Sequence, residues 1–114
     1  MKDKLLIITK IKQTIEYIDK TISNFPNKEN NLKTRINNTM YELLENTYNG
    51  NINKNDIRKK YQNKTIINLR MLDYYLKLSM NKKIISLKKY TTIGNYLLEI
   101  YDLIIIWIRN EKNI

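Results

Sequence analysis

The scarcity of turn-forming residues constrains the fold of this chain more than any other feature of its sequence. Among 114 residues there are two glycines, Gly50 and Gly94, and one proline, Pro26. Glycine and proline are the strongest local signals for turns and chain breaks. With so few of them the chain has few places to reverse direction sharply, so the sequence predicts a small number of long helices.

Apolar residues at spacings of three and four draw two stripes in the first half of the chain, as expected for amphipathic helices. The first stripe predicts a helix over residues 4–24, which ends at Phe25-Pro26 because proline cannot continue the helical hydrogen-bond ladder. The second predicts a helix that ends near Tyr48, where Asn49-Gly50-Asn51 offers left-handed backbone positions. The two stripes consist of Ile8, Ile11, Ile15, Ile18, Ile22 and Phe25, and of Leu32, Ile36, Met40, Leu43 and Thr47.

Two further stripes follow in the second half of the chain. We expect Asn53 or Asn55 to cap the third helix, a short break at Asn81-Lys82-Lys83, and Ser86 to cap the fourth helix. Gly94 lies inside the fourth helix, where glycine costs about 1 kcal/mol relative to alanine. The two stripes consist of Ile57, Tyr61, Thr65, Leu69, Leu72, Leu76 and Met80, and of Tyr90, Ile93, Leu97, Ile100, Ile104 and Trp107 or Ile108.

Four amphipathic helices of about 20 residues with short connections predict an all-α fold, an antiparallel up-down four-helix bundle. We expect residues 1–114 to form this bundle as a single domain. The fourth helix also carries apolar residues outside its main stripe, namely Leu98, Tyr101 and Ile105. A helix that is apolar on more than one face needs a second partner, so we expect self-association.

The composition argues against catalysis and against a metal site. The chain has neither histidine nor cysteine, which removes the commonest general base, the commonest metal ligand and any thiolate site. Di-metal bundles combine Glu with His at spacing i, i+3, whereas this chain offers only carboxylate pairs, for which ion pairing with lysine is favoured. Ser86 and Lys89 have the spacing of a serine-nucleophile motif without its companion motifs, so Ser86 is interpreted as a helix cap. We expect no enzyme and no cofactor. The carboxylate pairs are Glu16/Asp19, Glu42/Glu45 and Glu99/Asp102.

Neither apolar run in the sequence fits a targeting or membrane segment. The run from Leu5 to Ile8 is too short for the core of a signal peptide. The run over residues 103–108 is far below the roughly 20 residues that span a bilayer. We therefore expect a cytoplasmic protein that does not contact a membrane.

Positive charge is concentrated in one stretch of the chain. The formal net charge is +10, and residues 54–89 hold eleven Lys and Arg against two acids, Asp56 and Asp73. An excess this local is typical of a protein that binds a polyanion, whereas a solvated lysine face usually contains acids at i, i+4. Charge alone leaves DNA, RNA and an acidic protein open as partners. The candidate nucleic-acid contacts are Arg58, Lys59, Lys60, Lys64, Arg70, Lys77, Lys82, Lys83, Lys88 and Lys89.

Four tyrosines lie in the same stretch, and aromatic rings can stack on unpaired bases. Tyr61 and Tyr90 occupy stripe positions, so we expect them in the core or at a helix seam. Tyr74 and Tyr75 are the better stacking candidates, although a helix surface is a poorer platform than a sheet.

A set of short phrases runs through all four expected helices. They are Asn24-Phe25-Pro26, Leu32-Lys33-Thr34-Arg35-Ile36, Leu43-Leu44-Glu45-Asn46, Ile67-Asn68-Leu69-Arg70-Met71-Leu72, Leu76-Lys77-Leu78, Ile84-Ile85-Ser86-Leu87-Lys88-Lys89-Tyr90, Leu97-Leu98-Glu99-Ile100 and Trp107-Ile108. In this order, the set resembles the small four-helix-bundle proteins that include Avd, the accessory variability determinant of diversity-generating retroelements. The chain departs from that pattern at residues 101–104, which are bulkier than the small residues usual in the family and bear on the oligomer interface.

The resemblance implies a non-enzymatic, basic, oligomeric bundle, pentameric in the Avd type. Such proteins partner a retroelement reverse transcriptase and bind nucleic acid, RNA or an RNA–DNA hybrid, during template-primed cDNA synthesis. A sister branch is encoded in intervening sequences of large-subunit ribosomal RNA genes. That branch implies an alternative function, a self-assembling scaffold whose basic face docks an acidic protein partner.

Overall fold

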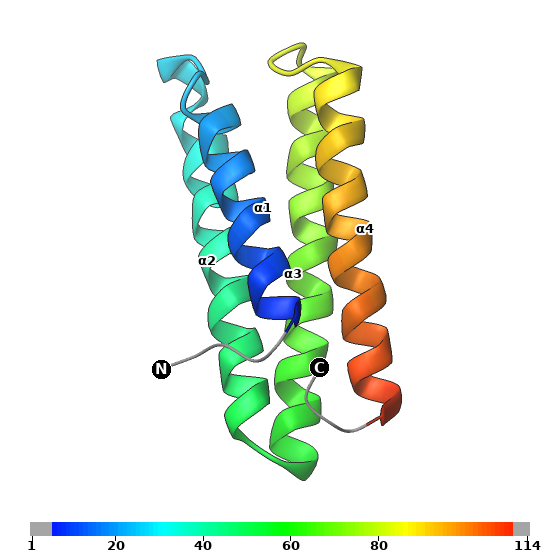
Figure 1. The fold of residues 1–114 in the computed structure, drawn as a ribbon. Helices are drawn as coiled ribbons and strands as arrows, with labels where there is room; N and C mark the ends of the chain where they lie inside the picture. Colours follow the sequence, from blue (N-terminus) through cyan, green and yellow to red (C-terminus); the bar gives the residue numbers. More distant parts are fainter. Residues whose placement is uncertain (1–5, 111–114) are drawn as a thin grey trace.

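The structure, a computed structural model, describes residues 6–110 and is built from long helices with short connections (Figure 1). Neighbouring helices run in opposite directions, so the predicted all-α, antiparallel up-down four-helix bundle is confirmed. The elements are α1 (Leu6–Ile22), a short 3-10 helix η1 (Asn27–Glu29), α2 (Asn30–Ile52), α3 (Asn55–Asn81) and α4 (Leu87–Asn110).

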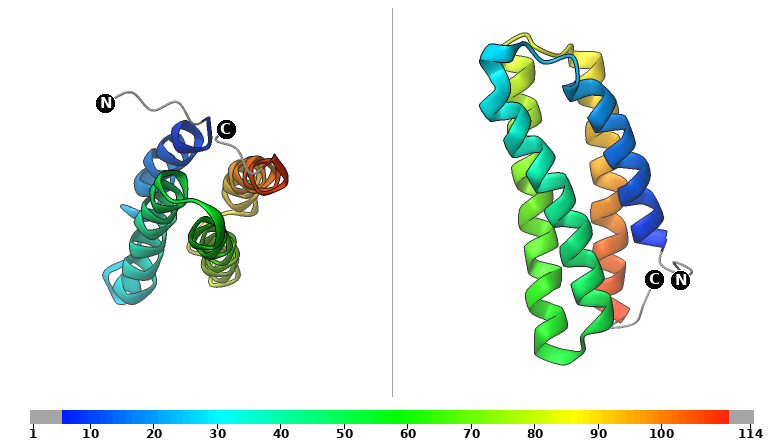
Figure 2. Two further views of the ribbon diagram at one scale, coloured as in Figure 1. Left: turned by 90° about the horizontal axis from the view of Figure 1, so that it is seen from below. Right: turned by 90° about the vertical axis from the view of Figure 1, so that its left-hand side faces the viewer.

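The helices pack in a ring. Each long helix contacts its neighbours in the chain, and α4 packs back against α1 (Figure 2). The described part of the chain forms a rod with extents of 42 × 25 × 23 Å. In this arrangement α3 lies between α2 and α4, and its remaining side faces outward.

The predicted stripes of the first two helices form the core. All their members are buried, and Ile11, Ile18 and Ile36 are fully inaccessible. Ile93, Ile100 and Ile104 of α4 are equally inaccessible and complete the core from the other side. The spacing of apolar residues therefore predicted these three helix faces correctly, and each is stabilised by removing apolar surface from water.

The stripe of α3 is wrong at its first position, because Ile57 is 54% exposed. The predicted stripe reached Ile57 from Leu69 by three steps of four residues. Each such step turns an α-helix about 40° beyond a full turn, so three steps carry Ile57 about 120° away from the buried line.

The predicted end of α2 near Tyr48 is also wrong, since the helix continues through Gly50 to Ile52. Gly50 has no positive φ, so it does not act as a turn residue. A Cβ atom on Gly50 would instead lie 2.6 Å from Cη2 of Trp107, which is fully buried. Gly50 is therefore needed for the close approach of the Trp107 ring to α2.

The α2–α3 connection does not use asparagine as a helix N-cap, contrary to the prediction. The N-cap of α3 is Lys54, which makes no side-chain capping hydrogen bond. Asn53 instead caps the C-terminal end of α2, because its Nδ2 donates to the carbonyl oxygen of Asn49 over 2.7 Å. Asn55 has a φ of 56°, a left-handed conformation that asparagine tolerates better than most residues.

The other predicted boundaries agree more closely with the structure. The break after α3 is confirmed, with Lys83 at a φ of 64°. Ser86 is confirmed as the cap of α4, since the backbone amide of Lys89 donates to its Oγ over 3.0 Å. Helix α1 ends at Ile22, two residues before the predicted end, and the predicted start at Lys4 lies outside the described residues.

Helix α4 is long and apolar enough to cross a membrane, judged by length and composition alone. Within its most apolar window, 28% of the residues are buried inside the bundle. Core helices of soluble proteins pass the same test, and α4 supplies the core isoleucines named above.

Candidate nucleic-acid interface

The two neighbours of α3 fix which of its sides face outward. Toward α2, Asn46 Nδ2 donates to Asn68 Oδ1 over 2.8 Å, and Asn68 Nδ2 donates to Glu42 Oε2 over 3.4 Å. Toward α4, the Tyr90 hydroxyl donates to Asp73 Oδ1 over 2.7 Å. The surface of α3 between these two contacts, on the side away from the core, is open to solvent.

The contact between Tyr90 and Asp73 also changes the acidity of the tyrosine. Burial, and then the hydrogen bond to Asp73 and the negative charge of Asp73, raise the pKa of Tyr90 to about 12. The hydroxyl therefore stays protonated and keeps donating to Asp73 throughout the neutral pH range.

Five exposed residues follow one another along the outward side of α3. Their spacings of four, three, four and three place them on one face of the helix. We call this face the outer stripe; it consists of Lys60, Lys64, Ile67, Met71 and Tyr74. The outer stripe is basic near the start of α3 and apolar in its middle.

A second row of cations lies beside the outer stripe, on the side of α4. It consists of Lys59, Arg70 and Lys77, which are eleven and seven residues apart and so nearly in line on the helix. Asp73 falls in the same row, which places the row toward Tyr90 of α4. All three cations are exposed, and none makes an ion pair with a residue in the range 6–110. The row spans 18 residues, or about 27 Å at 1.5 Å per residue.

Arg58 has a different position from the other predicted contacts. Its Nε donates to the carbonyl oxygens of Gly50 and Asn53, both over 2.9 Å, and its Nη2 donates to that of Asn51 over 3.0 Å. These acceptors belong to the end of α2, where helix carbonyls lack partners within the helix. Arg58 thus stabilises the α2–α3 connection, and its contact with nucleic acid stays a prediction.

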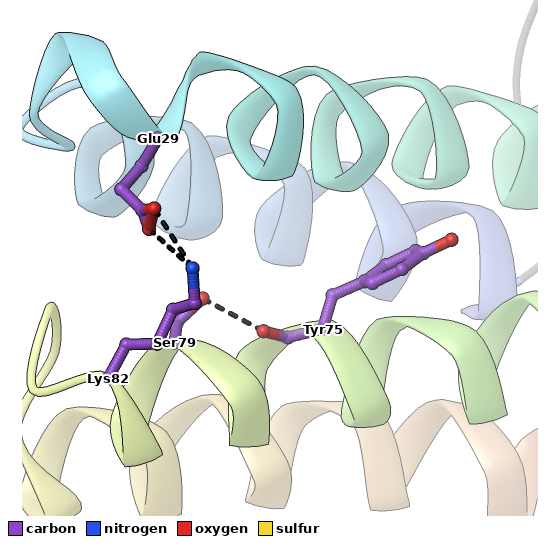
Figure 3. A network of polar contacts seen from close by, with 4 residues as sticks. All are labelled: Glu29, Tyr75, Ser79 and Lys82. Atoms are coloured by element: carbon purple, nitrogen blue, oxygen red, sulfur yellow. Dashed lines mark hydrogen bonds and ion pairs between the residues drawn. The ribbon is translucent and has the colours of Figure 1, made fainter.

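The predicted contact Lys82 is already paired with an acid. Its Nζ lies 3.0 Å from Glu29 Oε1 at the start of α2, next to Ser79, whose hydroxyl donates to the Tyr75 carbonyl (Figure 3). Lys82 is half exposed, so this pair is worth no more than about 1 kcal/mol. A phosphate would have to compete with Glu29 for Lys82.

The remaining predicted contacts lie in the α3–α4 connection and at the start of α4. Lys89 donates to the Tyr17 hydroxyl over 3.3 Å, and its Nζ lies 4.9 Å from the centre of that ring. Lys83 and Lys88 are exposed and form no ion pair with any described residue. Lys88 and Lys89 occupy the first turn of α4, where the positive end of the helix dipole disfavours cations, so these lysines do not stabilise the helix through its dipole.

The structure therefore brings the predicted residues together in two groups. Lys59, Lys60 and Lys64 lie near the α2–α3 connection, whereas the residues from Lys82 onward lie near the α3–α4 connection at the opposite end of the rod. About 27 Å of helix separates Lys64 from Lys82, and along it Arg70 and Lys77 continue the positive charge.

A cleft of about 650 Å³ opens beside the first group, between the start of α3 and the end of α4. The buried Gln62 lines it, and its Nε2 has no hydrogen-bond partner among the described residues. Ammonium and amide groups can donate to phosphate oxygens, although Asp56 adds one negative charge here. The lining residues are Lys54, Asn55, Asp56, Arg58, Lys59, Gln62, Asn63 and Ile108.

The two tyrosines predicted to stack on bases differ in exposure. Tyr74 is 57% exposed, whereas Tyr75 is half-buried against the core. Their ring centroids lie 5.9 Å apart. The sequence interpretation overlooked Ile67 and Met71, although their spacing to Tyr74, at i, i+4 and i+7, already places the three on one face.

The carboxylates do not gather into a metal site. Glu99 makes an ion pair with Lys10 over 2.8 Å, and Glu42 accepts the hydrogen bond from Asn68. Within residues 6–110 no group of three or more acidic side chains is placed to hold a metal ion.

The fold and the charged surface of α3 define a class, that of basic four-helix-bundle proteins. Within that class, the sequence matches the profile of the bAvd-like family over residues 5–111. The chain belongs to this family, which confirms the resemblance seen in its phrases. The family is of an accessory, non-catalytic type.

A solved structure supports the fold independently of the family match. It is a protein of unknown function from the S23 ribosomal protein family of Bacteroides thetaiotaomicron, with a TM-score of 0.82. The alignment covers 91% of this chain and 96% of the other at 17% sequence identity, which establishes a shared fold. No curated protein matches the chain.

Proposed function

We propose that this protein is a nucleic-acid-binding accessory factor that assists the reverse transcriptase of a diversity-generating retroelement in template-primed cDNA synthesis in the cytoplasm. The observation that carries the proposal is the row Lys59, Arg70 and Lys77, none of which forms an ion pair with a described residue and whose three positive charges outnumber the one acid in the row, Asp73. Cations held along a rigid helix suit the phosphates of RNA or an RNA–DNA hybrid. Membership of the bAvd-like family supports the accessory role.

The proposal includes assembly into a homo-oligomer, with the Avd-type pentamer as the expected form. Helix α4 supplies a surface for it, because Leu98 is 57% and Ile106 43% exposed. A Cβ atom on Gly94 would meet nothing within 4 Å, so another helix could approach α4 closely there. Tyr101 and Ile105, also predicted to lie outside the main stripe, are half-buried.

The experiment compares two charge-reversal variants that change the net charge equally. One carries Lys59→Glu, Lys60→Glu and Lys64→Glu on α3. Its matched control carries Lys12→Glu, Lys28→Glu and Arg35→Glu, exposed cations of α1, η1 and α2. Binding of labelled single-stranded RNA, duplex DNA and an RNA–DNA hybrid is measured across a salt series, and light scattering gives the mass.

We expect the α3 variant to lose affinity and its salt slope to fall by about one for each phosphate contact removed. The control should keep most of both. Equal losses in the two variants would show that only net charge matters, and absence of binding by the unchanged protein at low salt would refute the function.

The alternative is a self-assembling scaffold of the ribosomal RNA intervening-sequence branch, whose basic face docks an acidic protein. One observation favours this alternative function: the structural neighbour comes from the S23 ribosomal protein family. A gene position inside a ribosomal RNA operon would favour this scaffold, whereas a neighbouring reverse-transcriptase gene with template and variable repeats would favour the accessory factor.

A further inference from the structure

Apolar side chains are exposed in the middle of the basic helix. Ile67 and Tyr74 are each 57% exposed and Met71 is 37% exposed. They lie at i, i+4 and i+7, so they form one continuous patch on the outer stripe. We call this patch the apolar belt. Exposed apolar residues scattered singly need no explanation, whereas three in a row on one helix face form a candidate interaction surface.

The apolar belt has a positively charged border. Lys60 and Lys64 precede it on the same face, and Arg70 and Lys77 border it on the side of α4. None of these four makes an ion pair with a described residue. The carboxylate of Asp73, which accepts the hydrogen bond from Tyr90, offsets only one of these four positive charges. An occupant of the belt therefore has to present both apolar surface and negative charge.

That requirement distinguishes between the possible occupants. A second copy of the chain would bring the same positive charge to the belt. Like charges that face each other across an interface weaken the binding free energy by several kcal/mol. Duplex nucleic acid brings phosphates but keeps the faces of its bases stacked inside. Single-stranded nucleic acid brings both phosphates and unpaired base faces, which stack on aromatic and apolar side chains.

The position of Tyr74 suits it to stacking. Its ring lies 5.9 Å from that of Tyr75, centroid to centroid, with an angle of 58° between the planes. Tyr75 in turn packs against the core. Tyr74 is thus supported on one side and open on the other, so less side-chain freedom is lost when a base stacks on it.

We propose that the apolar belt binds unpaired bases, with Tyr74 as the stacking residue and the bordering cations on the adjacent phosphates, so that the protein prefers single-stranded nucleic acid to duplex. This inference rests on the proposed nucleic-acid function and adds the strand class that the site selects. The positive charge extends from the start of α3 to Lys77 and continues after the helix at Lys82 and Lys83, which fits a uniformly charged strand.

The test compares Tyr74→Ala with Tyr41→Ala, which removes a ring of similar exposure, 51%, from α2. Tyr74→Phe keeps the ring and removes only the hydroxyl. The probes are a labelled uridine-rich RNA, a DNA single strand of equal length, and the corresponding duplexes. Circular dichroism checks that each variant stays helical.

We expect Tyr74→Ala to weaken single-strand binding about fivefold or more while leaving duplex binding and the salt slope unchanged. Tyr41→Ala and Tyr74→Phe should bind like the unchanged protein. If Tyr74→Ala binds both strand classes as before, or weakens both equally, the inference fails while the proposed function stands.

Two other outcomes would distinguish a failure of this inference from a failure of the proposed nucleic-acid-binding function. Absence of binding to any probe by the unchanged protein would remove the proposed function itself. A glutamate-rich amphipathic peptide that displaces the RNA from the unchanged protein, and that Tyr74→Ala no longer binds, would overturn the proposal in favour of an acidic helix as occupant.

Discussion

Helices α1 and α3 distribute their side chains in opposite ways. Helix α1 buries six isoleucines and two threonines, whereas α3 buries three leucines together with four polar residues. On its outside α3 exposes Ile57 and the apolar belt, while the one large apolar residue exposed on α1 is Leu6, the first residue described. The core alone accounts for the sequence of α1. It does not account for α3, whose outer surface we attribute to binding. The buried polar residues of α3 are Gln62, Thr65, Asn68 and Ser79.

The largest expected effect separates the two helices by stability. Ile18→Ala in α1 removes a fully buried side chain and should cost about 2–5 kcal/mol in the free energy of unfolding. Ile67→Ala in the apolar belt should change stability by no more than about 0.5 kcal/mol. Urea denaturation measures both values. Similar losses of unfolding free energy in the two variants would mean that the belt is part of the folded core, and would contradict the proposed difference between α1 and α3.

The next effect concerns the two glycines, which the sequence does not distinguish. Gly50→Ala places a Cβ atom 2.6 Å from the Trp107 ring and should cost about 1–3 kcal/mol through overpacking. Within a single bundle Gly94→Ala meets open space in an α-helix, so at protein concentrations too low for self-association it should stabilise the fold by up to about 1 kcal/mol. Thermal unfolding of both variants is the measurement. Equal effects of the same sign would contradict the assigned packing of Trp107.

The smallest effect tests how α3 is held against α4. The pKa of Tyr90 is raised to about 12 in the fold from about 10 in an unfolded chain. The protonated hydroxyl of Tyr90 therefore contributes fully to the free energy of unfolding below pH 10, and this contribution is lost as the pH rises through 12. Unfolding free energies of the unchanged protein and Tyr90→Phe, compared across this range, should therefore converge. A constant difference would show that the hydrogen bond to Asp73 does not couple to stability.

The sequence predicted the helix faces well where the buried residues are apolar. Ile11 and Ile18 of α1 and Ile100 of α4 lie where their spacing placed them. The prediction failed at Ile57, because successive four-residue steps move around the helix axis. It failed at Gly50, because the sequence does not show whether a glycine ends a helix or leaves space for an aromatic ring packed against it. Contacts between distant residues, such as that of Gly50 with Trp107, leave no local pattern.

The candidate site could be predicted only in part for a similar reason. The charge of residues 54–89 located the basic helix, but charge does not show which cations have partners. The hydrogen bonds of Arg58 to the end of α2 and the pairing of Lys82 with Glu29 depend on how the connections fold. The apolar belt was visible as a spacing, yet its exposure follows only from the positions of α2 and α4.

The most direct test of the central claim, that the outer surface of α3 serves binding, is an NMR titration of the labelled protein with a short single-stranded RNA. We predict chemical-shift changes along residues 59–77 of α3, largest around Lys64, Met71 and Tyr74, with residues 7–15 of α1 unchanged. Chemical-shift changes centred on α1 and α2 would contradict the account. So would the absence of changes in α3 at RNA concentrations that saturate the protein in the binding assays.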